Sequence, residues 1–302
     1  MAMRIGFIGL GQMGFPMFQN LSRKLPGAEV LGYDKSAARM AQLRENGQAA
    51  GLAPGQDALA GLDVLITMLP NGAAVRACLL GEQGGTPLGR RLAAGATVID
   101  MSSSSPMDTR QLARELGETG INLVDAPVSG SVPKARDGTL AIMAGGEDAV
   151  IERMRPLFLA MGAKLIKTGA VGSAHGMKAL NNYVYAAGLL AMSEALLLGK
   201  SMDLDLGVLI DVMNVSSGRN VATETKARQH MLNGGDFKAG FGLHLMAKDL
   251  GIAAGLREQA GFNPPQLALC QELWQHACTQ LPVDADNTEI YRYLAARLGA
   301  AL

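Results

Sequence analysis

The sequence predicts a doubly wound parallel α/β domain followed by an all-helical C-terminal domain, with a long helix joining the two. Short apolar runs alternate with helix-length segments over the first half of the chain, which is typical of a parallel sheet covered on both faces. After Gly172 the strand patterns stop and helical patterns continue to the C-terminus. With 302 residues the chain is long enough for two domains. We therefore predict a first domain over residues 1–170 and a second over residues 171–302.

Seven short runs rich in Val, Ile and Leu are predicted to form the strands of the first domain. They cover residues 4–9, 28–34, 63–69, 96–101, 121–127, 140–146 and 163–169. The long helix that follows carries the segment SAHGMKALNNYV, residues 173–184. Its polar residues recur at helical spacing and so share one face: Lys178, Asn181, Asn182 and Tyr185. Leu180 and Val184 are expected to pack into the core on the other side.

Composition excludes several classes of partner. Lys plus Arg equals Asp plus Glu at 27 each, so the balanced charge argues against a nucleic-acid or anionic-membrane binder. The three cysteines are few, odd in number and without metal-ligand spacing, so we expect neither disulfides nor a metal site. The same cysteine usage indicates a reducing compartment. The longest uncharged span, residues 179–193, is shorter than the roughly 20 residues of a membrane helix. A cytoplasmic protein is the expectation.

A glycine-rich loop lies between the first strand and the first helix. Its sequence, GLGQMG, has the G-x-G-x-x-G spacing, and Asp34 ends the next strand. This context predicts a Rossmann-type dinucleotide site. The alternative is a glycine-rich turn without a ligand, which would not account for the strand before the loop, the helix after it and the acidic residue at position 34. An acidic residue at position 34 favours NAD, because it would bond the ribose 2′-hydroxyl; Lys35 and Arg39 keep NADP open. The predicted loop consists of Gly9, Leu10, Gly11, Gln12, Met13 and Gly14.

Seven motifs in one order make the chain resemble the β-hydroxyacid dehydrogenase family over nearly its whole length. They are FIGLGQMGFPM at 7–17, TMLPNG at 67–72, DMSSSSP at 100–106, DAPVSGS at 125–131, GTLAIMAGG at 138–146, GMKALNN at 176–182 and KDL at 248–250. Two further stretches, SSGRN at 216–220 and HLMAKDL at 244–250, resemble the branch of threonate-type enzymes.

The resemblance implies an NAD(P)-dependent enzyme that oxidises the β-hydroxyl of a small 3-hydroxy acid to an aldehyde or ketone. It implies Lys178 and Asn182 as catalytic residues and a substrate site formed by Ser129, Gly130, Ser131 and Asn181. Beyond the glycine loop and Asp34, the implied cofactor contacts are Met68, Leu69, Pro70, Ser102, Ser103 and Lys248. Two positions depart from the family pattern: Ala174 and Ser131 stand where relatives commonly have glycine.

Alcohol oxidation needs a base for the hydroxyl proton, and burial lowers the pKa of a lysine. We therefore expect Lys178 to act as general base in oxidation and general acid in reduction, with Asn182 holding the hydroxyl or the carboxylate. On this stretch alone, a surface lysine at a helix start fits equally well. His175 is expected to be a polar residue at the helix start, because the sequence shows no carboxylate partner for it.

Other functions remain as alternatives. One is an NADPH-dependent aldehyde, semialdehyde or imine reductase on the same scaffold, and another is a catalytically silent cofactor-binding regulator. Lys178 argues against the imine reductase, and Lys178 with Asn182 argues against the silent regulator. The second half of the chain is rich in apolar residues, and a run such as LLAMSEALLLG at 189–199 needs packing partners on several sides. We therefore expect the protein to form a homodimer or homotetramer.

Overall fold

The computed structural model describes residues 2–45, 61–82 and 87–300. The chain divides into two compact units, Met1–Lys178 and Ala179–Leu302. The division falls inside the long helix α7, Ser173–Ser201, shortly after the point where the strand patterns of the sequence stop.

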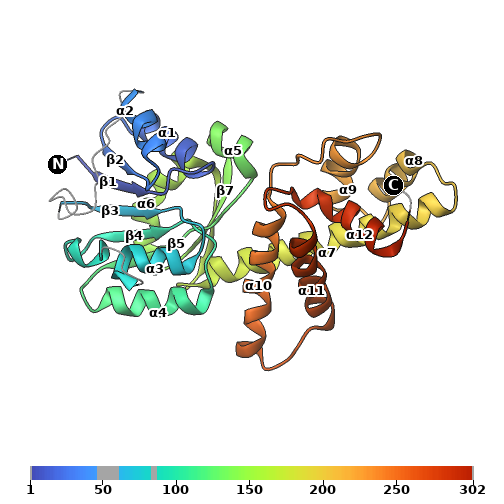
Figure 1. The fold of residues 1–302 in the computed structure, drawn as a ribbon. Helices are drawn as coiled ribbons and strands as arrows, with labels where there is room; N and C mark the ends of the chain where they lie inside the picture. The colour runs from blue at the N-terminus through green and yellow to red at the C-terminus, as the bar shows by residue number, and fades with distance from the viewer. Residues whose placement is uncertain (1, 46–60, 83–86, 301–302) are drawn as a thin grey trace. The chain divides into compact units, whose positions relative to one another are not determined.

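The first unit is built on one eight-stranded sheet, shown in Figure 1. The strand order is β2-β1-β3-β4-β5-β7-β6, and β8 pairs with β7. All seven predicted strands are present, with ends that differ by a few residues. The strands are β1 Arg4–Ile8, β2 Glu29–Tyr33, β3 Val64–Thr67, β4 Thr97–Asp100, β5 Asn122–Asp125, β6 Val128–Ser129, β7 Leu140–Gly145 and β8 Gly162–Gly169.

The sheet is parallel from β2 to β5, as predicted, but its far edge is mixed. Strand β7 runs antiparallel to both β5 and β6, and the two-residue strand β6 was not expected from the sequence. Only residues 130–139 separate β6 from β7. That connection is shorter than the dozen or more residues that a parallel crossover needs, so the chain folds back on itself.

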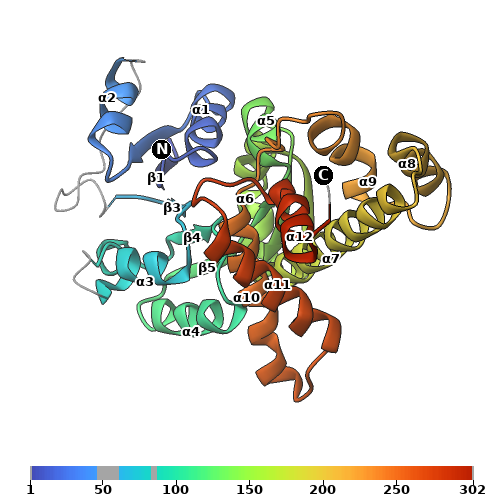
Figure 2. The same ribbon diagram turned by 45° about the vertical axis from the view of Figure 1, so that its right-hand side comes forward.

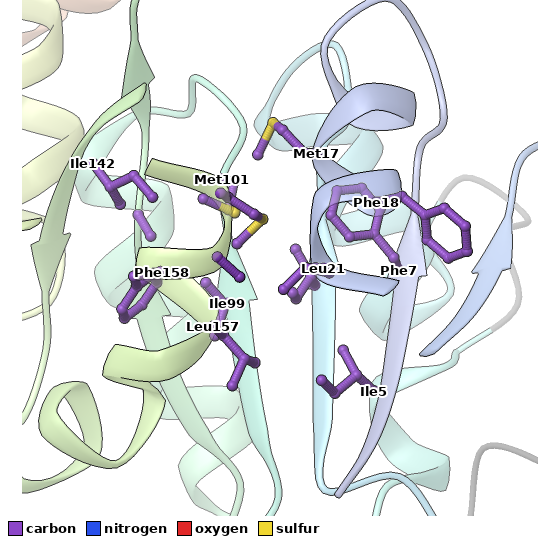
Figure 3. Close-up of a cluster of buried hydrophobic side chains, with 14 of the residues drawn as sticks. Ile5, Phe7, Met17, Phe18, Leu21, Ile99, Met101, Ile142, Leu157 and Phe158 are labelled. Carbon is purple, nitrogen blue, oxygen red and sulfur yellow. The ribbon is translucent and has the colours of Figure 1, made fainter. Parts of the chain in front are cut away.

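Helices cover both faces of this sheet, and alternate side chains of each strand enter a different core. Ile66, Ile99 and Val124 belong to the core under α1 and α6, part of which Figure 3 shows, whereas Leu65 and Val98 belong to the core under α3 and α4. Burial on both sides explains why the strands are almost continuously apolar. The helices of this unit are α1 Gly14–Lys24, α2 Ala37–Glu45, α3 Gly72–Leu80, η3 Gly89–Arg91, α4 Pro106–Gly117, α5 Ser131–Asp137 and α6 Asp148–Met161.

The second unit is all helical, with its own core around the fully buried Trp274. Figures 1 and 2 both show α10 and α11 side by side. Its elements after α7 are α8 Leu206–Val215, α9 Val221–Thr225, η4 Ala227–Met231, α10 Leu243–Ala260, α11 Pro265–Gln280, η5 Asn287–Glu289 and α12 Ile290–Leu298. Across the ranges that the structure describes, none of the helices has the length and apolar character to cross a bilayer.

The predicted orientation of α7 is wrong for two of its apolar residues. Leu180 and Val184 are 46% and 69% exposed, whereas the polar Asn182 is only 6% exposed. The reason is a buried partner that the local sequence does not reveal: Asp249 of α10 accepts a hydrogen bond from the Asn182 side chain. This pairing turns the amide inward and leaves Leu180 and Val184 on the surface.

Candidate active site

The glycine loop has the geometry of a phosphate-binding turn. Gly9 has a φ of 96°, and a side chain there would collide with the Met68 carbonyl. A side chain at Gly14 would collide with the Gly9 carbonyl, whereas the position of a Cβ at Gly11 has no neighbouring atom within 4 Å. Two glycines are thus required by packing, and the third leaves the backbone open to a ligand.

Helix α1 begins directly at Gly14. Its N-cap residue is Met13, and no side chain caps the start of the helix, so the Gly14 N–H is suited to an external anion, whereas the Phe15 N–H donates to the Gly11 carbonyl at 3.1 Å. Pro16 lies in the first turn, where its missing N–H costs nothing. The residues present therefore fit the pyrophosphate of a dinucleotide.

Asp34 connects the end of β2 to this loop. Its Oδ2 accepts a hydrogen bond of 2.6 Å from the Leu10 N–H, and its Oδ1 accepts one of 2.8 Å from the Ser36 N–H. A carboxylate has about four acceptor sites, so both oxygens keep capacity for a ribose hydroxyl. The guanidinium of Arg39 contacts Gln42 and the ring of Phe15, so it is engaged within the helices beside the loop.

The loops after β3 and β4 are joined by Ser102. Its Oγ accepts a hydrogen bond of 2.9 Å from the Leu69 N–H, which ties it to the Met68–Pro70 segment. The buried carboxylate of Asp100 accepts hydrogen bonds of 3.0 Å from the Ser102 N–H and the Ser104 hydroxyl. The predicted cofactor residues of the first unit thus follow the carboxyl ends of the neighbouring strands β1, β2, β3 and β4, where ligands of open α/β sheets bind.

The start of α7 is held by a second buried carboxylate, Asp125, at the end of β5. Asp125 accepts hydrogen bonds from the backbone N–H groups of Gly172, at 2.7 Å, and of His175, at 2.9 Å. His175 lies in the first turn of α7, as expected, but the residue is only 1% exposed. Its ring nitrogens lie 3.8 Å from Asp100 and 3.9 Å from Asp125, too far for hydrogen bonds, and they contact the Ser102 carbonyl and the Thr109 hydroxyl instead.

Ser129, Gly130 and Ser131 form the turn between β6 and α5. Gly130 has a φ of 138°, and a side chain there would collide with that of Lys134. Ser131 has a φ of 56°, a left-handed conformation that is unusual for a residue other than glycine, and its hydroxyl donates to the Gly130 carbonyl at 2.6 Å. Of the two departures from the family pattern, this one carries backbone strain.

The other departure, Ala174, carries none. It is fully buried and lies in the first turn of α7 with helical backbone geometry. The cost expected for alanine in a left-handed position therefore does not arise there.

Lys178 is half-buried and is the last residue of the first unit. Asn182 follows one turn later on the same helix, in the second unit, where its Nδ2 donates to Asp249 Oδ2 at 2.5 Å. Asn181 donates to Asn182 Oδ1 at 3.2 Å, and Lys248 Nζ lies 3.3 Å from Asp249 Oδ1. Asp249 thus brings together the three predicted site residues of the second unit.

Three buried carboxylates were missed as site residues. Asp100, Asp125 and Asp249 hold, respectively, the loop of Ser102, the start of α7 and the side chain of Asn182. The available signal was their place in the motifs DMSSSSP, DAPVSGS and KDL, in which each is the only carboxylate.

Two family models together match nearly the whole chain. Residues 4–171 match the family described as the NAD binding domain of 6-phosphogluconate dehydrogenase, and residues 172–294 match the NAD-binding family of NADP-dependent 3-hydroxyisobutyrate dehydrogenase. The 2-(hydroxymethyl)glutarate dehydrogenase of Eubacterium barkeri is 34% identical over 91% of this chain and 89% of its own. The 2-hydroxy-3-oxopropionate reductase of Escherichia coli is 34% identical over 97% of both chains.

A solved structure of Mycobacterium tuberculosis 3-hydroxyisobutyrate dehydrogenase with L-serine matches with a TM-score of 0.88 and 31% identity, over 97% of this chain and 99% of that one. A Streptomyces aurantiacus imine reductase matches with a TM-score of 0.59 at 18% identity, which shows a shared fold alone. The fold and the glycine loop define a two-unit nicotinamide-dependent oxidoreductase. The chain belongs to the β-hydroxyacid dehydrogenase family.

Proposed function

We propose that this protein oxidises the β-hydroxyl of a small 3-hydroxy acid to the aldehyde or ketone with NAD(P). The observation that carries the proposal is the half-buried Lys178, on a helix whose start is fixed by Asp125 at the edge where the glycine loop lies. Membership in a family whose named relatives are dehydrogenases and reductases of hydroxy acids supports it.

The glycine loop and α1 would hold the cofactor pyrophosphate, and Asp34 the adenosine ribose. Met68–Pro70, Ser102, Ser103 and Lys248 are proposed as the remaining cofactor contacts. Bound cofactor supplies the hydride acceptor. Asp34 supports NAD over NADP, because its carboxylate would repel a 2′-phosphate. A higher kcat/KM with NAD than with NADP is therefore expected.

Lys178 is proposed to remove the hydroxyl proton through Nζ during oxidation and to return it during reduction. Asn182 would hold the hydroxyl or carboxylate, and its hydrogen bond to Asp249 supports this role because it fixes the amide orientation. Ser129 and Gly130 would hold the substrate carboxylate, with Ser131 and Asn181 beside them. The small side chains of the 129–131 turn support close approach of a carboxylate to the backbone.

The substrate is best sought with a panel of acids that carry a hydroxyl on the third carbon. The names of the relatives suggest 3-hydroxyisobutyrate, L-serine and 2-(hydroxymethyl)glutarate, with 2-hydroxy-3-oxopropionate in the reducing direction. Formation or loss of reduced nicotinamide is followed by absorbance with each acid and either cofactor. No turnover in either direction would contradict the proposed activity.

Lys178→Ala is expected to lower kcat by about 10²- to 10⁴-fold while NAD binding measured by calorimetry stays near wild type, because a general acid–base group acts mainly in the transition state. Lys200→Ala is the matched control, since Lys200 is a half-buried lysine in the last turn of the same helix. Near-normal turnover by Lys178→Ala would refute the assignment.

A reductase working from the aldehyde with NADPH is the second candidate, and the 2-hydroxy-3-oxopropionate reductase relative supports it. It uses the same residues in the reverse direction, so kcat/KM measured in both directions decides which is favoured. Lys178 continues to argue against imine reduction.

We propose that residues 1–170 bind the nucleotide and that residues 171–302 serve substrate binding and assembly into a homodimer or homotetramer. Exposed apolar side chains support the assembly. They lie at helical spacing on α7, at Leu180, Val184, Ala191 and Leu198, and on α8, at Val208, Val212 and Val215. The three cysteines are free thiols, which supports a cytoplasmic location.

A further inference from the structure

A continuous path of hydrogen bonds joins the loop after β3 to the start of α7. The Leu69 N–H donates to Ser102 Oγ at 2.9 Å. The Ser102 carbonyl lies 3.1 Å from Nε2 of His175, and the His175 N–H donates to Asp125 at 2.9 Å. Every member of this path belongs to the first unit.

The His175 ring is fixed at both nitrogens. A carbonyl oxygen can only accept, so Nε2 carries the proton that bonds Ser102. Nδ1 lies 2.8 Å from the Thr109 hydroxyl on α4. Because Ser102, His175 and Asp125 are all buried, water cannot replace these bonds, and loss of one leaves a polar group unsatisfied.

The backbone is fixed by the same residue. Asp125 accepts the N–H of His175, so the first turn of α7 cannot shift along its axis without breaking a buried charge-assisted hydrogen bond. Lys178 lies three residues later on that helix, on the face that His175 shares with it. The place of the lysine therefore depends on how His175 is held.

We propose that His175 is a positioning residue, which sets the start of α7, and with it Lys178, against the Ser102 loop. This inference rests on the proposed function, in which Ser102 contacts the cofactor and Lys178 takes the proton. The cofactor, which accepts the hydride, and Lys178, which accepts the proton, must both reach the same carbinol group of the substrate. A misplacement of either by about 1 Å can lower the rate by about 100-fold. The Ser102 carbonyl bond is the functional contact, and the Thr109 bond is only structural.

Three variants separate these roles. His175→Leu removes both ring contacts at similar volume. His175→Gln keeps an N–H donor that can reach the Ser102 carbonyl. Thr109→Val removes the contact to Nδ1 together with the bond from the Thr109 hydroxyl to the Ser105 carbonyl, so it is the control for buried hydrogen bonds lost beside the same ring. Each is measured by thermal unfolding, by NADH binding, by amide exchange of segments 100–105 and 172–180, and by kcat with the panel acid that wild type oxidises.

His175→Leu is expected to lower kcat by about 10- to 100-fold, to raise the primary isotope effect of the deuterated acid, and to speed amide exchange in both segments. His175→Gln should restore kcat to within about threefold, whereas Thr109→Val should lose thermal stability with kcat and the isotope effect unchanged. Should His175→Leu fail to fold, His175→Met, which also lacks both ring contacts, takes its place in the comparison with His175→Gln.

Two results would overturn the proposal. One is unchanged kcat and isotope effect in His175→Leu. The other is a loss of kcat in Thr109→Val that matches its loss of stability, since this would make the role of His175 purely structural. If wild type oxidises no acid of the panel, the proposed function fails, whereas the exchange rates of segment 100–105 in His175→Leu and Thr109→Val still show whether His175 couples that loop to α7.

Discussion

Ser131 is the residue at which the site stores backbone strain. Its φ of 56° costs a residue with a side chain about 1 kcal/mol, and glycine avoids that cost. We expect Ser131→Gly to be more stable than Ser131→Ala by about 1 kcal/mol. Both variants lose the hydroxyl bond to Gly130, so the difference between them isolates the backbone conformation. Urea unfolding measures it, and an alanine variant as stable as the glycine variant would contradict the strain.

The cysteine thiols give a pH-dependent prediction. Burial raises the pKa of Cys78 to about 12 and that of Cys270 to about 12. Each folded-state pKa lies above the unfolded value, so the stability that the protonated thiols contribute is present below pH about 8.5 and is lost as the pH rises toward 12. The free energy of unfolding should fall less steeply over this range in Cys270→Ala than in wild type.

The same shifts predict low thiol reactivity at neutral pH, because the thiolate is the nucleophile. Iodoacetamide should label Cys78 and Cys270 slowly in the native protein and quickly in urea, as followed by mass spectrometry. Rapid labelling of the native protein at pH 7 would show that these thiols are neither protonated nor shielded.

At the scale of elements, the strands were predictable because burial on both faces leaves a local apolar signal. The direction of β7 was not, since it depends on the short connection through α5 rather than on β7 itself. The glycine loop was predictable for a similar reason: its glycines, strand and helix are neighbours in sequence. The close approach of Gly9 to Met68 joins segments more than fifty residues apart. The glycine itself still indicates, from the local sequence alone, that no side chain fits at that position.

Helix α7 shows what local spacing cannot provide. The spacing correctly places Lys178 and Asn182 one turn apart, but it does not indicate which side faces inward. That was decided by Asp249, which lies 67 residues from Asn182 in the sequence. Asp125, 50 residues from His175, fixes the start of the helix by accepting a backbone N–H. Buried polar pairs of this kind leave no periodic signal, because each partner is a single polar residue within an otherwise ordinary motif.

At the scale of the molecule, the exposed apolar residues of α7 and α8 predict the assembly state. Val184→Glu with Leu198→Glu should convert an oligomer to a smaller species while the fold is kept, because both side chains are more than 60% exposed. Leu159→Glu on α6 is the control, being an exposed leucine of the first unit. Light scattering after size exclusion gives the mass. A monomeric wild type would disprove the assembly.

The capping of α7 by Asp125 limits how the protein can be dissected. A truncated chain that ends at residue 171 retains the buried carboxylate but lacks the N–H groups of Gly172 and His175 that satisfy it, whereas one that ends at residue 185 keeps both. An unsatisfied buried charge costs several kcal/mol, so only the longer fragment should unfold cooperatively in urea. The smallest part of the strand-rich half that folds on its own therefore extends into helix α7.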